Sequence, residues 1–233
     1  MKTTYASIFL AAAFFLASCG AGKNTPSGPA SSRFSNKEVL KQSRKEAKVY
    51  QKEGFKTFIG GIPLARQLEN AWLKTNYADE AGIKEYIVTN ARVIGGNASA
   101  AKMQALHLAK VEMAGLISSN IASLIESSTA NNELSQQEAV SVNNALQASK
   151  ELITADLGRV LNEVEIYREL PNKNVEVMVC LSYSSQQALD IARKNMAAKM
   201  EDKTEALHQK LDKLMGLDKF ASQSNTNLRI DAY

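Results

Sequence analysis

Alternation of hydrophobic and polar residues is clearest between residues 160 and 183, where two stretches show the two-residue period of β-strands. In the first stretch the apolar positions are Val160, Val164, Ile166 and Leu170, and the polar positions are Glu163, Glu165, Tyr167 and Glu169. The apolar positions of the second stretch are Val175, Val177, Val179, Leu181 and Tyr183. Turn-forming residues, 171–174, separate the two. The pattern predicts an antiparallel hairpin with one buried face and, on its first strand, one acidic face.

Four other segments show the spacing of amphipathic helices, at about residues 36–53, 64–76, 99–127 and from 135 onward. Asn36 and Gly54 have the residue types expected before and after the first of them, and Pro63 suits the start of the second. Ser135 followed by Glu138 is a capping-box pattern. These signals predict helices with defined starting points.

Two further stretches predict strands, a short one at 55–59 and a longer one at 83–94 that ends at Gly95-Gly96. The paired glycines lack the wider glycine spacing and the lysine of a phosphate-binding loop. We therefore interpret them as the turn between a strand and the next helix.

The last predicted helix starts after Ser184 and becomes strongly charged beyond Met200. Leu207, Leu211 and Leu214 nevertheless maintain an apolar seam along it. Two interpretations follow with equal weight: this portion projects and pairs with another copy of the chain, or the whole helix packs on its own sheet. Residues 217–233 read as a loose tail.

The N-terminus has the pattern of an export signal. Lys2 precedes an apolar run from Ile8 to Ala17, which is too short to cross a bilayer. Leu16-Ala17-Ser18-Cys19 is similar to the bacterial lipobox, and that similarity implies removal of residues 1–18 and acylation of Cys19. We expect no second run of spanning length, so that the acyl chains are the only anchor.

Residues 19–35 are rich in Gly, Ser, Ala and Pro after the cysteine and predict a flexible tether between anchor and folded region. Gly20, rather than Asp, follows the cysteine, which by resemblance to exported lipoproteins favours the outer membrane. No acidic cluster follows that would mark surface display, so the periplasmic face is expected.

Charge and cysteine content add two constraints. The chain carries 28 Lys and Arg against 24 Asp and Glu, a small surplus that says little about nucleic acid, and export argues against that partner. With Cys19 lipidated, Cys180 is the only thiol left, so no intramolecular disulfide can form. Cys180 lies in an apolar strand and is expected to be a buried small side chain rather than a nucleophile.

The first predicted helix gathers its positive charges on one side. The members of this set are Lys37, Lys41, Arg44, Lys45, Lys48 and Lys52. Either the set is a solvated helix face, which is the more common meaning of such a run, or it lies against anionic lipid headgroups close to the anchor.

No constellation of residues predicts catalysis, a cofactor or a metal ion. The two histidines, His107 and His208, are isolated, and no serine lies in a nucleophile-elbow motif. The acidic strand face could offer carboxylates to a cation or a sugar, although such faces are more often solvated or covered by basic side chains. Trp72, the only tryptophan, is expected to pack in the core.

Several segments together resemble the LPP-twenty family of bacterial lipoproteins: NARVIGG, AAKMQALHLAKVEMAGLI, GRVLNEVEIYREL and VEVMVCLSY. The resemblance covers roughly residues 83–200 and is stronger for the order of helices and strands than for function. It implies an α+β domain at 83–216, in which long helices pack on one face of a small, mostly antiparallel sheet, and an envelope location. The helical N-terminal region, residues 36–82, departs from the family domain.

These observations lead us to expect a membrane-anchored envelope lipoprotein with a structural, scaffolding or protein-interaction role and no enzymatic activity. Its partner would be a second copy or another envelope protein. The alternative is a lipoprotein that binds glycan or peptidoglycan, which predicts a pocket near the acidic strand face or around Trp72. An enzyme is the third choice.

Overall fold

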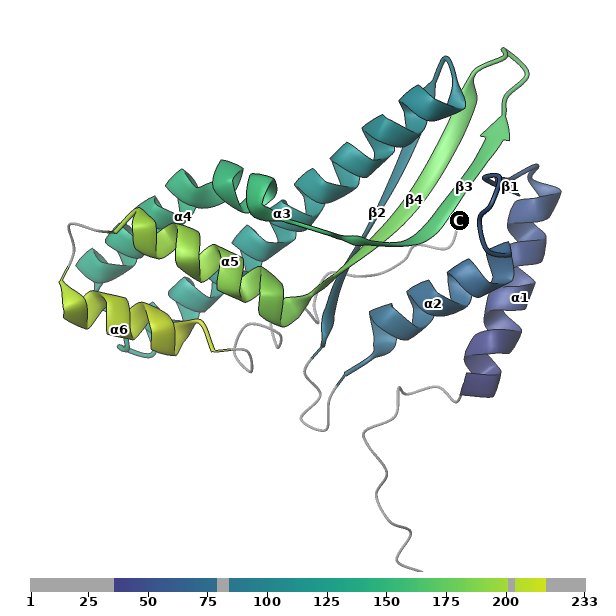
Figure 1. Ribbon diagram of the computed structural model, residues 1–233. Helices are drawn as coiled ribbons and strands as arrows, with labels where there is room; N and C mark the ends of the chain where they lie inside the picture. Colours follow the sequence, from purple (N-terminus) through teal and green to yellow (C-terminus); the bar gives the residue numbers. More distant parts are fainter. Residues whose placement is uncertain (1–35, 79–83, 201–203, 217–233) are drawn as a thin grey trace, which may run out of the picture.

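The computed structural model of the chain describes residues 36–78, 84–200 and 204–216 (Figure 1). The helices of this part are α1 (Asn36–Lys52), α2 (Leu64–Asn76), α3 (Ala98–Ala130), α4 (Gln136–Asp156), α5 (Ser185–Ala198) and α6 (Glu205–Leu214). Its strands are β1 (Lys56–Thr57), β2 (Tyr86–Gly95), β3 (Leu161–Glu169) and β4 (Val175–Ser184). The predicted elements are present with ends close to those expected, except that the last predicted helix is divided into α5 and α6.

The strands form one sheet in the order β1-β3-β4-β2, and every neighbouring pair is antiparallel. The predicted hairpin is present as β3 and β4, but the prediction that it has a single buried face was wrong. Val164 and Ile166 of β3 lie on the same face as Cys180, whereas the alternating apolar residues of β4 from Val175 to Tyr183 lie on the other face. In its turn, the backbone N–H of Lys173 donates to the carbonyl of Leu170, and Lys173 adopts a φ of 64°. The ten-residue strand β2 lies at one edge of the sheet, and the two-residue β1 lies at the other.

The first half of α3 lies on one face of the sheet. It meets the strands with Ala101, Ala105 and Ala109, all fully buried and spaced four residues apart, so that one stripe of small side chains faces the sheet. The strand residues on this face are Ile87, Ala91, Val177, Val179 and Leu181. Small side chains on the helix let its axis lie close to the larger aliphatic residues of the strands, which gives a dense apolar layer.

The second half of α3 extends past the sheet and is covered by α4, α5 and α6 (Figure 1). Here the buried positions are large, as with Met113, Ile117 and Ile121, because they face other helices rather than a pleated sheet. Sheet layer and helical layer thus share one continuous core along α3.

The C-terminal part departs from the predicted single long helix. Helix α5 ends at Ala198, and α6 is a separate helix that packs on α3 and α5. Leu207, Leu211 and Leu214 are buried in the chain's own core, Leu211 with only 1% of its surface exposed. The idea that this seam projects and pairs with another copy was wrong, because the break between the helices lets the seam fold back.

Helix α2 covers the opposite face of the sheet, and α1 packs chiefly on α2. A smaller apolar cluster joins them to the strands through Phe55, Leu64, Leu68, Val88 and Val164. The predicted fold class is confirmed: an α+β fold whose long helices pack on one face of a small antiparallel sheet, preceded by a helical N-terminal region. The N-terminal region also supplies β1 to the sheet.

Local signals set several helix ends. The Ser135 side chain and Glu138 form the predicted capping box at the start of α4, and Gly54 follows α1 with a φ of 89°, which favours glycine. Asn97 caps α3 by accepting a hydrogen bond from the backbone of Ala100. These ends were readable because they depend on neighbouring residues only.

Helix α3 is also long and apolar enough, by length and composition, to cross a membrane, and it is the one such helix among the residues that the structure describes. The expectation that no second run reaches spanning length was therefore wrong. Its buried side packs on the sheet and on three helices, and the core helices of folded domains meet the same criterion.

Candidate functional site

A β-bulge near the start of β3 shapes the principal candidate site. The pairing of β3 with β4 shifts register between Asn162 and Val164, so that Glu163 is an extra residue in the strand. Glu163 consequently lies on the α1–α2 face of the sheet with Val164, whereas Glu165 lies on the α3 face. Without the bulge, the two-residue period of a strand would have placed Glu163 and Glu165 on the same face of the sheet.

The side chain of Glu163 is buried despite its charge. Its residue surface is 8% exposed, and Ser182 Oγ of β4 donates a hydrogen bond to Glu163 Oε1 over 2.5 Å. Cys180, two residues before Ser182, is buried on the same face as a free thiol. Burial, followed by the negative charge of Glu163, raises the pKa of Cys180 to about 12. Cys180 is thus a buried core side chain, as predicted.

The single acidic face predicted for β3 does not exist. Glu165 forms an ion pair with Lys102 of α3, so on that side the charge is covered by a basic helix residue, which was one of the alternatives. The backbone N–H of Glu165 donates to Gln67 Oε1 over 2.7 Å. Because β1 pairs only with residues 166 and 167 of β3, this side chain satisfies the next donor along the strand edge.

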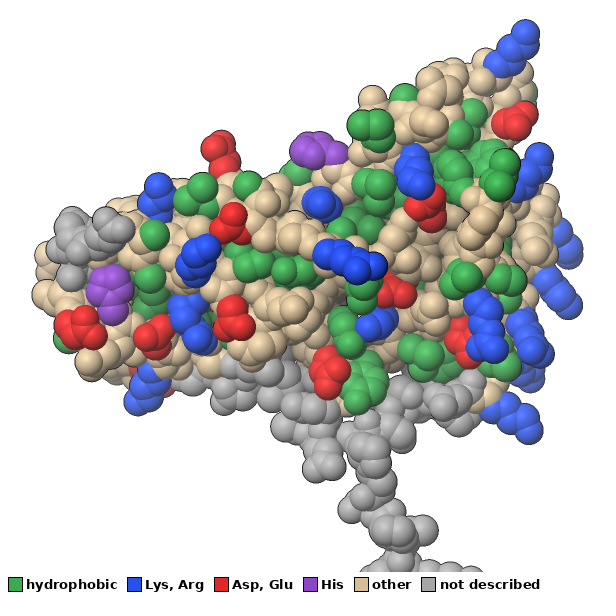
Figure 2. All heavy atoms as spheres, viewed as in Figure 1, with side chains coloured by type: hydrophobic (Ala, Val, Ile, Leu, Met, Phe, Trp, Pro, Cys, Tyr) green, Lys and Arg blue, Asp and Glu red, His purple; other side chains and the backbone are tan. Residues whose placement is uncertain are grey.

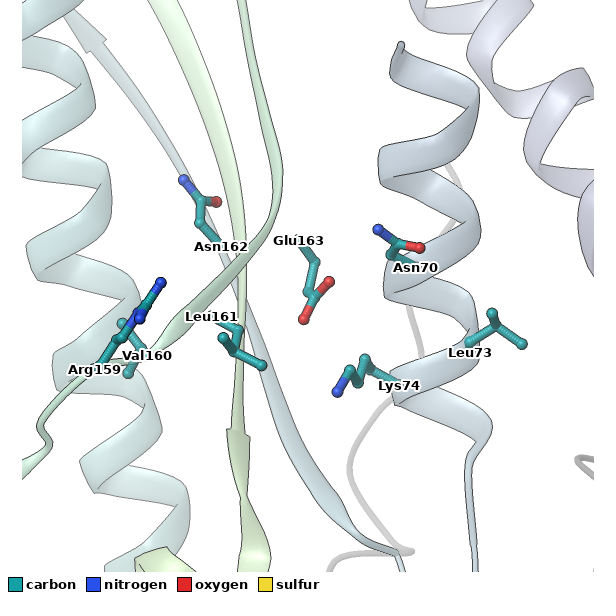
Figure 3. A pocket seen from close by; sticks show the side chains of 8 residues that line it. All are labelled: Asn70, Leu73, Lys74, Arg159, Val160, Leu161, Asn162 and Glu163. Atoms are coloured by element: carbon teal, nitrogen blue, oxygen red, sulfur yellow. The ribbon is translucent and has the colours of Figure 1, made fainter. Parts of the chain in front are cut away.

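A hollow of about 600 Å³ lies between α2 and the start of β3. Figure 3 shows the carboxylate of Glu163 and the amine of Lys74 both directed into the space between the strand and α2, with Asn70 on the helix wall. The complete lining is Asn70, Leu73, Lys74, Arg159, Val160, Leu161, Asn162 and Glu163. Of the three glutamates predicted to form the acidic strand face, only Glu163 lines this hollow.

The lining combines groups of opposite charge on an apolar floor. Lys74 and Arg159 donate hydrogen bonds, Glu163 accepts them, and the amides of Asn70 and Asn162 do both. Lys74 Nζ is held 3.5 Å from the centroid of the Tyr86 ring, which fixes its position. Such a set suits a neutral or zwitterionic ligand rich in hydroxyl, amide or amine groups. Sequence reasoning identified only Glu163 of these residues, because α2 meets β3 through tertiary packing alone.

A second hollow of about 600 Å³ lies beside α1, lined by Glu38, Val39, Lys41, Gln42, Lys45 and Trp72. Trp72 is half-buried, and its Nε1 donates to Glu46 Oε2 over 3.0 Å. The expectation that Trp72 packs in the core was therefore wrong: it lies between α1 and α2, outside both apolar clusters, and borders an accessible hollow at the other place where a pocket was expected.

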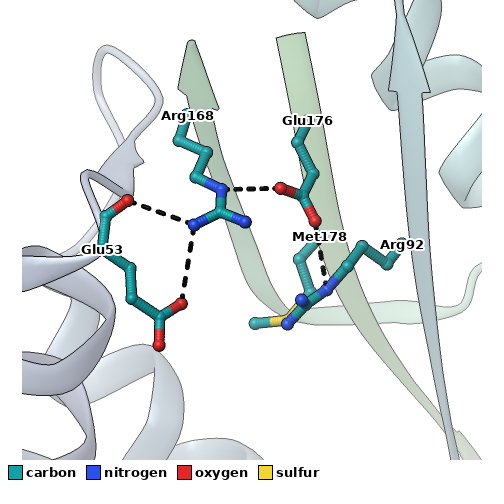
Figure 4. Close-up of polar contacts among 5 residues, drawn as sticks. All are labelled: Glu53, Arg92, Arg168, Glu176 and Met178. Atoms are coloured by element: carbon teal, nitrogen blue, oxygen red, sulfur yellow. Dashed lines mark hydrogen bonds and ion pairs between the residues drawn. The ribbon is translucent and has the colours of Figure 1, made fainter. Parts of the chain in front are cut away.

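Charged residues of β2, β3 and β4 lie on the same face of the sheet as α2, next to the C-terminal end of α1 (Figure 4). Arg168 Nε donates to Glu176 Oε2 over 2.6 Å, and Arg92 Nε lies 3.5 Å from Glu176 Oε1. Arg168 also donates to the backbone carbonyl of Glu53 at the end of α1, and both guanidinium groups lie over the ring of Phe55. We call these residues the charge cluster; its contacts connect α1 and the sheet.

The remaining candidates from the sequence do not converge. His208 contacts the backbone carbonyl of Met200 over 2.9 Å, and His107 lies exposed on α3. Among the residues that the structure describes, no three His, Cys, Asp or Glu side chains are arranged to hold a metal ion. Cys19, the predicted lipid-attachment residue, and the signal and tether lie outside the described residues.

Comparison with protein-family models, with curated proteins and with solved structures found no match for this chain. The resemblance to the LPP-twenty family therefore stays a prediction.

Proposed function

We propose that this chain is a lipoprotein of the bacterial envelope, anchored in the periplasmic face of the outer membrane through acylated Cys19, with a structural, scaffolding or protein-interaction role. The observation that carries the proposal is the Leu16-Ala17-Ser18-Cys19 segment directly after an apolar run. Three acyl chains would hold the protein permanently, since one chain alone binds reversibly.

Intact-mass spectrometry of the processed protein tests the anchor. We expect a polypeptide that begins at Cys19 and carries fatty acids, and we expect the Cys19→Ser form lacking residues 1–18 to be recovered in the soluble fraction. An unacylated first residue, or membrane recovery of the Cys19→Ser form that resists high salt, would contradict it.

The interaction role is supported by the outer surface of α3, away from the sheet. Met103, Leu108 and Val111 are exposed there, Met103 with 72% of its surface accessible. Exposed apolar side chains grouped on one helix face are typical of contact surfaces for other proteins. The leucine seam of α6 is buried in the chain's own core and is not available for such contacts.

Photo-crosslinking in intact cells tests the interaction role. We expect a crosslinking residue at position 103 or 111 to capture one defined envelope protein or a second copy, and the same residue at Val140, an exposed apolar position on α4, to capture neither. Size-exclusion chromatography with light scattering would identify self-association. A strict monomer that crosslinks to no defined protein from either position would contradict the proposal.

The hollow between α2 and β3 supports a second candidate, the binding of glycan or peptidoglycan fragments. Its buried carboxylate, two amides and two cations match the hydroxyl, amide and charged groups of such ligands. Calorimetric titration with soluble peptidoglycan fragments should show binding that Glu163→Gln and Asn70→Ala weaken and Arg66→Ala, an exposed change elsewhere on α2, does not. Equal affinity in all variants would exclude the hollow as the site.

A further inference from the structure

The charges of α1 are distributed unequally around the helix. The helix carries six Lys or Arg residues against two Glu. All six basic side chains are exposed, and none forms an ion pair with a residue that the structure describes. We call this set the basic stripe: Lys37, Lys41, Arg44, Lys45, Lys48 and Lys52.

The fold holds the basic stripe outward. Val39, Ser43 and Ala47 form the buried side of α1, at helical positions opposite the basic stripe. Figure 2 shows blue side chains gathered along the edge of the molecule where Figure 1 places α1. Since α1 packs chiefly on α2 and forms an outer layer, rotation of the helix would expose the apolar residues, and the charges are therefore fixed on one surface.

We propose that the basic stripe of α1 is a docking surface for the anionic headgroups of a phospholipid bilayer. Seventeen residues of helix present these cations along one side, a length of about 25 Å, which suits a flat charged surface better than a compact ligand. Lys and Arg side chains near an anionic leaflet are each attracted to it.

The position of α1 in the chain identifies the bilayer as the occupant, a step that rests on the proposed lipid anchor. Only residues 20–35 separate Cys19 from the first residue of α1. Even fully extended, a segment of this length spans at most about 55 Å, so the helix stays close to the bilayer and the local concentration of headgroups at the basic stripe is high. A lipid chain combined with a basic surface is a common two-part mode of membrane attachment.

The hollow at Trp72 lies beside the basic stripe and shares Lys41 and Lys45 with it. Docking would therefore cover the mouth of this hollow with headgroups. Trp72 is the chain's only tryptophan, so its fluorescence reports on this contact without a label. Docking would also direct the end of the molecule formed by α4, α5 and α6 away from the membrane, because that end lies opposite α1 in Figure 1.

Vesicle binding of the mature chain with Cys19→Ser tests the proposal without any lipid anchor. We expect binding to vesicles of phosphatidylethanolamine and phosphatidylglycerol, little binding to vesicles of phosphatidylcholine, and loss of binding at about 1 M salt, where the Debye length is about 3 Å. Protection of Trp72 from a water-soluble quencher should accompany binding.

Two matched triple variants localise the effect. Each Lys near an anionic surface contributes about a fivefold change in partitioning, so removal of three should weaken binding about a hundredfold. This is expected for Lys41→Gln, Lys45→Gln and Lys48→Gln. The control, with the same loss of charge at exposed sites in the α4 and α5 region, is Lys150→Gln, Lys194→Gln and Lys199→Gln. We expect the control to bind as the parent protein does.

Three results would overturn the docking surface: no preference for anionic vesicles, equal loss of binding in both triple variants, or binding with unchanged quenching of Trp72. None of them would affect the anchor, because acylation of Cys19 is measured separately by mass. Conversely, an unacylated native protein that still binds anionic vesicles through α1 would remove the anchor and keep the docking surface.

Discussion

The two faces of the sheet are built differently. On the α3 face, side chains such as Val177, Val179 and Leu181 meet alanines of α3 in a continuous apolar layer. On the α1–α2 face, apolar residues share the surface with buried Glu163 and Glu176, with Ser182 and with Gln67 of α2. One face depends on dense, non-directional packing, and the other on a smaller apolar cluster and specific polar contacts.

This difference suggests that one face of the sheet determines the stability of the fold and the other determines the positions of α1 and α2. Apolar burial contributes most of the free energy of folding, so the α3 face should determine whether the chain folds. Hydrogen bonds and ion pairs contribute less net free energy but require defined geometry, so the α1–α2 face should determine where α1 and α2 lie. The hollow at Glu163 and the basic stripe both belong to this second region.

Leucine truncation on each face should give the largest effects. Leu181→Ala, in the central strand β4, should lower the free energy of unfolding by about 4 kcal/mol, and Leu68→Ala in α2 by about 2 kcal/mol, because the looser cluster can collapse around the cavity. Urea unfolding measures both values. Hydrogen exchange should show local opening of α1 and α2 in Leu68→Ala alone; equal global destabilisation by both would remove the distinction.

The charge cluster should show strong coupling between Arg168 and Glu176. Arg168→Met leaves the carboxylate of Glu176, whose side chain is only 6% exposed, with the more distant Arg92, and we expect a loss of about 2–3 kcal/mol. Adding Glu176→Leu to Arg168→Met should recover part of the lost free energy of unfolding, because the double variant has no buried carboxylate at position 176. Urea unfolding of both single variants and the double variant provides the test, and additive effects would show that the pair is not coupled.

Gly95 tests how closely α3 approaches the sheet. A Cβ at Gly95 would lie 3.1 Å from the Cβ of Ala101, so Gly95→Ala should destabilise the protein by about 1–2 kcal/mol through displacement of the helix. Gly96→Ala is the matched control, because an added Cβ there meets no atom within 4 Å. Thermal unfolding should separate the two variants, and identical midpoints would show that the interface yields easily.

The smallest effect is expected at the helical end of the molecule. Hydrogen bonds from Lys210 and from the backbone and side chain of Ser135 lower the pKa of the Glu138 carboxyl to about 2. A pKa lowered by folding contributes stability above the unfolded value near 4.5, and this contribution is lost as the pH falls through about 2. The difference in unfolding free energy between the parent protein and Glu138→Gln should therefore be constant near neutral pH and shrink on acidification. A difference that does not change with pH would contradict the assignment.

Local patterns predicted most of the secondary structure correctly. The turn between β3 and β4, the Ser135 capping box and Gly54 after α1 each depend on residues close in sequence, and each is found where expected. The prediction of a single acidic face on β3 was wrong because Glu163 is an extra residue in the strand and shifts the alternation of its side chains. The prediction that the leucine seam of α6 pairs with another copy was wrong because apolar spacing shows only that a helix face is buried. It does not show which surface covers that face.

The hollow at Glu163 was only partly predictable. Asn70 and Lys74 are nearly ninety residues away from Arg159 and Glu163 in the chain, and no spacing rule connects them. The basic stripe, by contrast, was fully visible in the sequence, because one helix carries all its members.

The amino-acid sequence by itself determined most of the helices and strands, the Ser135 cap of α4 and the side on which α1 carries its charge, since each depends on interactions within a few residues. It also contains the segment on which the lipid-anchor prediction rests. Tertiary structure alone decided that α2 covers the second face of the sheet with α1 packed on it, that Glu163 and Glu165 lie on opposite faces, and that α6 folds back onto α3. These outcomes depend on which apolar surfaces pack together. Because the hydrophobic effect is non-directional, the local sequence does not specify the partner of an apolar surface.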